Sequence, residues 1–248
     1  MSAFLTLWRK ELTGYFLSPI AYIVMIFFLV VMGSIFSLLV SALAEAPGGI
    51  TVMNVLFGSP FYWMTMLVLV PVLTMRLFAE EKKAGTIETL MTAPVTDTAI
   101  VLAKYAGALS FYAFMWVPTA AYVFILSHFS SEMAPLDPGL LAGGYLGALL
   151  VGMFYIAIGL LCSALTSNQI VAAIITFAVM FVLFLAGLLD YVARGEAVQA
   201  FSAHVSSYAH MLEFSRGTID TRPLVYYLSG TALMLFSTVK IVEARAWK

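Results

Sequence analysis

The chain has 248 residues, of which 62% are hydrophobic and only 10% are charged, with a mean hydropathy of +1.01. Soluble domains carry about 25% charged residues, so this composition excludes an ordinary soluble domain. The formal net charge of −1 argues against nucleic-acid binding, which needs clustered lysine and arginine. The single cysteine, Cys162, excludes an intrachain disulfide and a metal site built from several cysteines.

The first predicted element is an amphipathic helix within residues 1–18. Its apolar side chains recur at spacings of three and four residues, and its charged residues fall largely on the other side. Such a helix is expected to lie in the membrane interface. Ser18 and Pro19 then break it, and proline suits the first turn of the next helix. The apolar face comprises Leu5, Trp8, Leu12 and Phe16, and the charged residues are Arg9, Lys10 and Glu11.

Charge-free stretches predict an all-α integral membrane protein with six membrane-spanning helices in one domain, because a span needs about 20 apolar residues. The longest stretch, residues 138–189, has 52 positions without Asp, Glu, Lys or Arg, which is too long for one crossing and fits two joined by a turn. Pro71 should kink the second span, and Pro118 lies inside the third. The spans are expected at about 20–43, 56–78, 98–127, 140–165, 169–189 and 223–242.

The distribution of basic residues predicts that both termini are cytoplasmic. In that orientation nine of the twelve lysines and arginines face the cytoplasm, and only Arg194, Arg216 and Arg222 lie outside. A five-span alternative would move the basic C-terminal residues outside, so we reject it. Residues 190–222 then form the largest outer segment. This segment is too polar to cross, and we expect one or two short helices there that dip into the outer leaflet or pack on the bundle.

The most informative polar segment is residues 79–97, between spans two and three. Span two can continue as a helix to Lys83, Gly85 can take a left-handed cap, and Thr86 can begin a short helix that ends at Pro94. An apolar patch on that helix either docks in the groove of a partner protein or rests on the membrane interface, and the residues alone favour neither. The patch consists of Ile87, Leu90 and Met91.

Two further patterns are candidate sites. Small residues recur every four positions on span four, at Gly144, Ala148 and Gly152. This spacing permits close helix packing either within one bundle or between subunits. Glu213 and Arg216, three residues apart in the outer segment, form a candidate outer gate or else an exposed pair of little energetic weight. Outer histidines and methionines lack the spacing of metal ligands, so no metal site is predicted.

Several sequence blocks resemble the ABC-2 class of ABC transporter permeases, and look most like the branch named for gliding motility. The similarity covers essentially the whole chain, and the central block is specific in combination with the helix layout. The blocks are YFLSPI (15–20), MRLFAEEKK (75–83) with Gly85, Thr86 and Glu88 after it, APV (93–95), SRGTID (215–220) and EARAW (243–247).

The resemblance implies a permease subunit in the bacterial inner membrane, which is not itself an enzyme. It would couple ATP hydrolysis by a separate ATPase subunit to substrate translocation, with export favoured. A second permease subunit, identical or paralogous, would complete the pathway, and a periplasmic auxiliary subunit often accompanies the gliding-type branch. Two ATPase copies would dock on the N-terminal helix and on a coupling segment that comprises Glu80, Glu81, Lys82, Lys83, Gly85, Thr86, Ile87, Glu88, Leu90, Met91 and Pro94.

No Gly-x-x-x-x-Gly-Lys-Ser/Thr motif occurs, so this chain is expected to bind no cofactor, and the partner ATPase would bind ATP and Mg²⁺. The alternative is an ion-coupled secondary transporter or channel without an ATPase, surrounded like the permease by membrane lipids. Such proteins usually keep ionisable groups at mid-membrane, whereas Arg76, Lys104 and Lys240 lie near the cytoplasmic ends of spans. An intramembrane enzyme is disfavoured because neither His-Glu-x-x-His nor a nucleophile elbow occurs.

Overall fold

The computed structural model describes residues 3–45, 52–86, 95–129, 137–192, 195, 202 and 204–245. Every regular element in these ranges is a helix, and six helical stretches are long and apolar enough to cross a membrane. The prediction of an all-α membrane protein with six spans is therefore confirmed. The stretches are Pro19–Ser41, Pro60–Ala84, Asp97–Ile125, Pro138–Leu165, Gln169–Gly187 and Thr221–Ala244.

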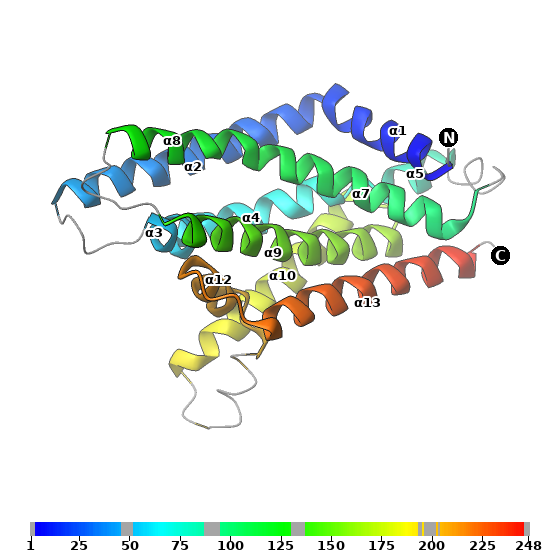
Figure 1. Cartoon of the computed structure of the whole chain (residues 1–248). Helices are drawn as coiled ribbons and strands as arrows, with labels where there is room; N and C mark the ends of the chain where they lie inside the picture. The colour runs from blue at the N-terminus through cyan, green and yellow to red at the C-terminus, as the bar shows by residue number, and fades with distance from the viewer. Residues whose placement is uncertain are drawn as a thin grey trace.

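Most of the long helices run along one direction, and α1 begins and α13 ends at the same end of the bundle (Figure 1). The short helix α12 lies toward the opposite end, packed on α9 and α3. In chain order the elements are α1 (Ala3–Leu17), α2 (Pro19–Glu45), α3 (Val52–Gly58), α4 (Pro60–Thr74), α5 (Ala79–Ala84), α7 (Asp97–Trp116), the 3₁₀ turn η1 (Val117–Thr119), α8 (Ala120–Phe129), α9 (Pro138–Leu165), α10 (Gln169–Val192), α12 (Ser207–Ser215) and α13 (Thr221–Arg245).

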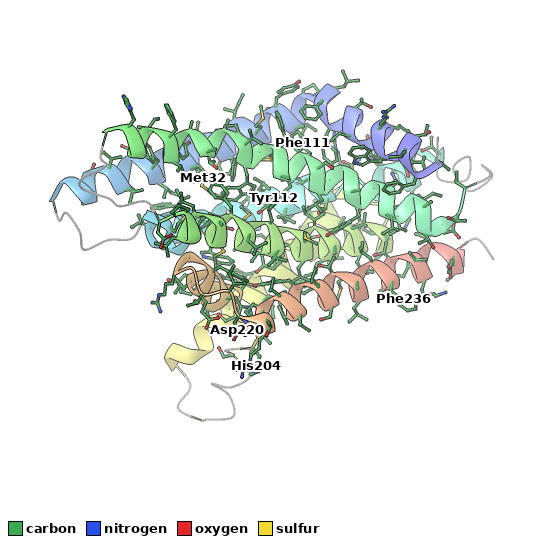
Figure 2. All side chains as sticks on the ribbon, viewed as in Figure 1. Met32, Phe111, Tyr112, His204, Asp220 and Phe236 are labelled. Carbon is green, nitrogen blue, oxygen red and sulfur yellow. The ribbon has the colours of Figure 1, made fainter. Side chains whose placement is uncertain are left out.

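Helix α9 is the centre of the bundle. In its apolar window 78% of the residues are buried, against 67% for the span that contains α4 and 22–33% for the other four. Glycines on α9 allow this, because a Cβ at Gly144 would lie 2.7 Å from the Phe57 ring on α3, and one at Gly152 would lie 2.2 Å from the Tyr112 ring on α7. Ala148, between them, is fully buried. The small-residue ladder thus contacts other helices of the same chain. Figure 2 labels Tyr112, the α7 partner of Gly152.

Span two differs from the single helix expected over 56–83. It begins later, because Ser59 caps α4 by accepting a hydrogen bond from the Phe61 N–H and Pro60 takes the first turn. Residues 52–58 form a separate helix. Past Pro71 the helix lasts one more turn, and a turn at 75–78 separates α4 from α5. The left-handed cap at Gly85 is confirmed, with φ +70°.

The remaining boundaries depart from expectation by small amounts. Span three was expected to end near residue 127, but α8 continues to Phe129. At Pro118 span three changes from α-helical to 3₁₀ geometry through η1, an interruption expected at an internal proline. Asp137 then caps α9 through the Gly139 N–H at 2.8 Å, which fixes where span four begins. In the outer segment, α12 packs on the bundle with Ser206 as its N-cap.

We expect Gly152→Ala to destabilise the protein by about 1–3 kcal/mol, because the new methyl group would overlap the Tyr112 ring in a packed core. Gly14→Ala is the matched control, since a Cβ at this exposed helical position meets nothing within 4 Å. It should be neutral or stabilising by up to about 1 kcal/mol. Thermal unfolding of the two purified variants in detergent measures the difference, and equal melting temperatures would contradict the close packing of α9.

Candidate functional site: a polar junction at the end of span two

The turn between α4 and α5 leaves backbone groups of a membrane helix without helical partners. One side chain, Ser163 on α9, satisfies three of them. Its fully buried hydroxyl accepts from the N–H of Phe78 at 3.0 Å and of Ala79 at 3.1 Å, and donates to the carbonyl of Met75 at 3.0 Å. One donor and two acceptor positions are all that a serine hydroxyl has, so it is saturated by this turn. We call the segment 75–84, with the residues that contact it, the junction.

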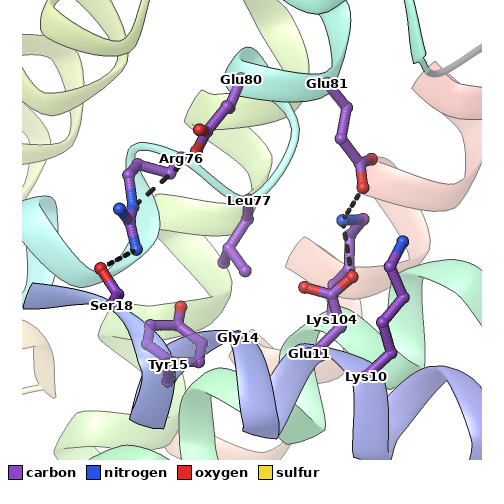
Figure 3. A pocket seen from close by; sticks show the side chains of 10 residues that line it. All are labelled: Lys10, Glu11, Gly14, Tyr15, Ser18, Arg76, Leu77, Glu80, Glu81 and Lys104. Carbon is purple, nitrogen blue, oxygen red and sulfur yellow. Dashed lines mark hydrogen bonds and ion pairs between the residues drawn. The ribbon is translucent and has the colours of Figure 1, made fainter.

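A buried lysine ties three helices together at the junction. The ammonium of Lys104, on α7, lies 2.8 Å from a carboxylate oxygen of Glu81 on α5 and 3.0 Å from one of Glu11 on α1. Figure 3 shows both carboxylates directed at it. Only 3% of the Lys104 side chain is exposed, and its ammonium also lies 5.3 Å from the centre of the Phe78 ring. Gly107 makes room, because a Cβ there would lie 2.8 Å from the Glu11 Cβ.

Further polar contacts join the junction to the elbow between α1 and α2. Tyr15 donates a hydrogen bond to the Leu73 carbonyl at 2.7 Å, and burial raises the pKa of this phenol above its ordinary value, so it stays protonated. Arg76 donates to the hydroxyl of Ser18 at 3.1 Å. On the other side, the Lys82 ammonium donates to the carbonyl of Ala164, next to Ser163. The junction is thus held from α1, α7 and α9.

The junction borders an open pocket of about 320 Å³ (Figure 3). Its charged walls hold three carboxylates and three cations, and α1 forms one side while the junction forms the other. The charged residues are Lys10, Glu11, Arg76, Glu80, Glu81 and Lys104, and the other lining residues are Gly14, Tyr15, Ser18 and Leu77.

The predicted coupling segment lies only partly within the described residues. Glu81 and Lys82 reach other helices, and Glu80 lies 3.9 Å from Arg76 one turn away. Lys83, Gly85 and Thr86 are exposed. The rest of the set lies outside the described residues, namely Ile87, Glu88, Leu90, Met91 and Pro94.

The N-terminal helix follows the expected amphipathic pattern except at Glu11. Its apolar side chains lie against α7, where the Trp8 indole donates to Ser110 at 3.2 Å and Phe16 meets Phe111 edge-on at 5.5 Å between ring centres. Leu12 is half-buried there, and Leu5 stays 39% exposed. Arg9 and Lys10 face outward as expected, whereas assigning Glu11 to the outer face was wrong.

At the far end of the bundle, Glu213 and Arg216 are both exposed at the end of α12. Among the described residues, no ion pair joins their side chains. The Glu213 carbonyl instead accepts from the hydroxyl of Thr218 at 2.8 Å and from the backbone N–H of Arg216 at 3.0 Å. These contacts end the helix and hold the following turn.

Sequence reasoning missed Ser163 and the three-way contact of Lys104. A lone lysine within an otherwise apolar span was the available signal, because a charge there requires a partner. Because Lys104 lies near the predicted cytoplasmic end of the span, its side chain was expected to face solvent. A serine in an apolar run carried no signal of its own.

An all-α bundle with six spans and a polar junction at one end defines a multi-pass membrane protein built around a helix break. The model of the family described as ABC-2 family transporter protein matches residues 28–219. The chain therefore belongs to this family. No curated protein matches the chain. As a member, it is a membrane component of an ABC transporter rather than a catalytic subunit, and the family in general works with an ABC ATPase.

We expect Ser163→Ala to destabilise the protein by about 1–3 kcal/mol, because two buried N–H groups of the turn lose their acceptor. Ser229→Ala is the matched control, since that hydroxyl is exposed and bonds only to carbonyls of its own helix. The control should change stability by less than about 0.5 kcal/mol. Thermal unfolding in detergent compares the two, and a Ser163 effect no larger than the control would contradict the role of this hydroxyl.

We expect Lys104→Gln to weaken the packing of α1 and α5 on the bundle and to lower the free energy of unfolding by about 3 kcal/mol. The reason is that two largely buried carboxylates lose their shared cation. Limited trypsin digestion measures this as faster cleavage after Lys82 and Lys83. Adding Glu11→Gln and Glu81→Gln to this variant should restore resistance to trypsin, because no unpaired carboxylate then remains beside residue 104.

The control for the lysine is Lys240→Gln, which removes an exposed pair with Glu243 at 2.7 Å. Exposed pairs contribute at most about 1 kcal/mol, so digestion should proceed as in the wild type. Unchanged digestion of Lys104→Gln would show that the three-way contact does not hold α5.

Proposed function

We propose that this chain is the permease subunit of a bacterial ABC-2 exporter of the gliding-motility type, driven by two copies of a separate ATPase. ATP and Mg²⁺ bind to the ATPase, and this chain binds neither. A second permease subunit, identical or paralogous, completes the pathway, and a periplasmic auxiliary subunit accompanies the pair. The observation that carries the proposal is the junction, which links the start of the coupling segment to three other helices through Ser163 and Lys104.

In this proposal the ATPase docks on the segment 80–94 and on α1. The described start of this segment, residues 80–86, and α1 both meet the junction at the end of the bundle where α1 begins and α13 ends (Figure 1). Nine of the twelve basic residues belong to this end in the six-span orientation, which supports a cytoplasmic location for it and for both termini.

The junction provides a route for mechanical coupling. Movement of the docked segment would pull α5, and the Ser163 and Lys104 contacts would pass the displacement to α9 and α7. Proline interruptions at Pro71 and at Pro118 let the outer parts of spans two and three tilt while the junction moves as a unit. The pathway between two permease subunits would then open outward, with Glu213 and Arg216 at its outer gate.

The cargo is proposed to be lipidic, hydrophobic or polymeric. Outward-facing sides of α2, α10 and α13 carry large apolar and aromatic side chains, such as Ile26, Phe177 and Phe236. A pathway bordered by these faces offers few polar groups to replace the hydration shell of a small ion, which disfavours ion transport.

The proposal is tested by purifying the tagged chain from its own membranes in mild detergent and identifying co-purifying proteins by mass spectrometry. We expect an ATPase with a P-loop to follow the wild type and to be lost with Leu90→Asp, because a charge would replace an apolar docking contact. Glu88→Lys should also weaken the association. The matched charge reversal Glu243→Lys, in the last span, should retain it.

Two outcomes would contradict the proposal. Recovery of the wild-type chain without any ATPase, together with no ATPase stimulation in proteoliposomes, would favour an ATP-independent transporter or channel. Normal association and transport by Leu90→Asp and Glu88→Lys would show that the segment 80–94 is not the docking site.

A further inference from the structure

An apolar groove of about 210 Å³ lies at the elbow where α1 turns into α2. Helices α1, α2 and α7 form its walls, and Phe16 packs edge-on against Phe114 at 5.1 Å between ring centres. Tyr22 and Phe114 stand at the rim, because they are 47% and 43% exposed. The groove therefore opens toward the surroundings of the bundle. Its lining consists of Tyr15, Phe16, Ala21, Tyr22, Met25, Phe111 and Phe114.

The charged pocket beside the junction borders the same tyrosine. Tyr15 lines both cavities, so polar and apolar space meet at this one side chain. The three carboxylates and three cations of the pocket balance to zero. Lys10, Arg76 and Glu80 are the accessible members. The Arg76 and Glu80 side chains are 24% and 56% exposed and lie 3.9 Å apart, which leaves their pairing loose. Lys104 is occupied by Glu11 and Glu81.

Both cavities lie at the level where span one begins. The apolar span starts at Pro19, directly after the break at Ser18, and Ser18 itself lines the charged pocket. In a bilayer this is the depth at which headgroups give way to acyl chains. A single amphiphile could therefore place its polar end by Arg76 and Glu80 and its apolar end in the groove.

We propose that this elbow binds one bilayer phospholipid with a zwitterionic primary-amine headgroup, phosphatidylethanolamine in type. Its phosphate accepts hydrogen bonds from the Arg76 guanidinium, its ammonium donates to the Glu80 carboxylate, and one acyl chain fills the groove. This site goes beyond the transport function proposed above and requires no ATPase.

The charges select this headgroup over two common alternatives. An anionic headgroup without an amine leaves the Glu80 carboxylate unpaired and brings a net charge into a pocket that is already balanced. A choline headgroup has the right net charge but carries no N–H to donate to a carboxylate. The bound lipid would bridge α1 and α2 and so hold the elbow at a fixed angle.

Native mass spectrometry of the full-length chain, stripped of lipid in detergent, tests the proposal. Dioleoyl phosphatidylethanolamine, phosphatidylcholine and phosphatidylglycerol are titrated separately. We expect one saturable molecule with highest affinity for the ethanolamine lipid. Phe114→Ala should lower that affinity about tenfold, the size expected for a lost apolar contact.

Phe27→Ala is the matched control, because Phe27 has the same 43% exposure on α2 but does not line the groove. It should bind the lipid as the wild type does. Glu80→Gln should keep one bound lipid but lose the preference for ethanolamine over choline.

Equal affinity for the three lipids would overturn the proposal, as would equal losses for Phe114→Ala and Phe27→Ala, since either result describes an unselective lipid annulus. Circular dichroism melts of each variant confirm that the affinities refer to folded protein. The assay contains no ATPase, so failure of the transport proposal leaves its outcome unaffected.

Discussion

The structure depends on the hydrogen bonds that Ser163 makes to the broken end of span two. A helix that stops within a bundle leaves buried N–H and C=O groups that must find partners, because each unpaired group costs free energy. One hydroxyl meets this requirement for three of them. The break is consequently a defined structural element, fixed in position by α9, rather than a frayed helix end.

Glycines determine which polar groups can meet. A Cβ at Gly159 would lie 2.1 Å from the Thr74 hydroxyl, so α9 and α4 touch one turn before Ser163 and bring it to the break. Gly107 does the same for α7 and α1, one turn after Lys104, and places Glu11 within reach of its ammonium. On both α9 and α7, a glycine that permits close helix approach therefore lies one turn from the polar side chain that uses it.

This arrangement separates rigid parts from an adjustable one. The long spans are held by apolar packing around α9, whereas α5 makes few contacts with other helices and is held through Ser163, Lys82 and Glu81. Polar contacts of this kind depend on direction and distance, so they can exchange partners when the element they hold is displaced. In the function proposed above, this region is the part that the docked ATPase displaces.

The class of this protein, its six spans, the interruption at Pro118 and the cap at Gly85 follow from the sequence, because hydrophobic length, proline and glycine act through local backbone chemistry. Family membership was also readable from the blocks at 15–20 and 75–88. The split of span two, the inward position of Glu11 and the contact of Lys104 with two carboxylates become visible only in the packed bundle. These features depend on which helices approach within hydrogen-bonding distance, and the contacts concerned join residues 23 to 93 positions apart in the chain.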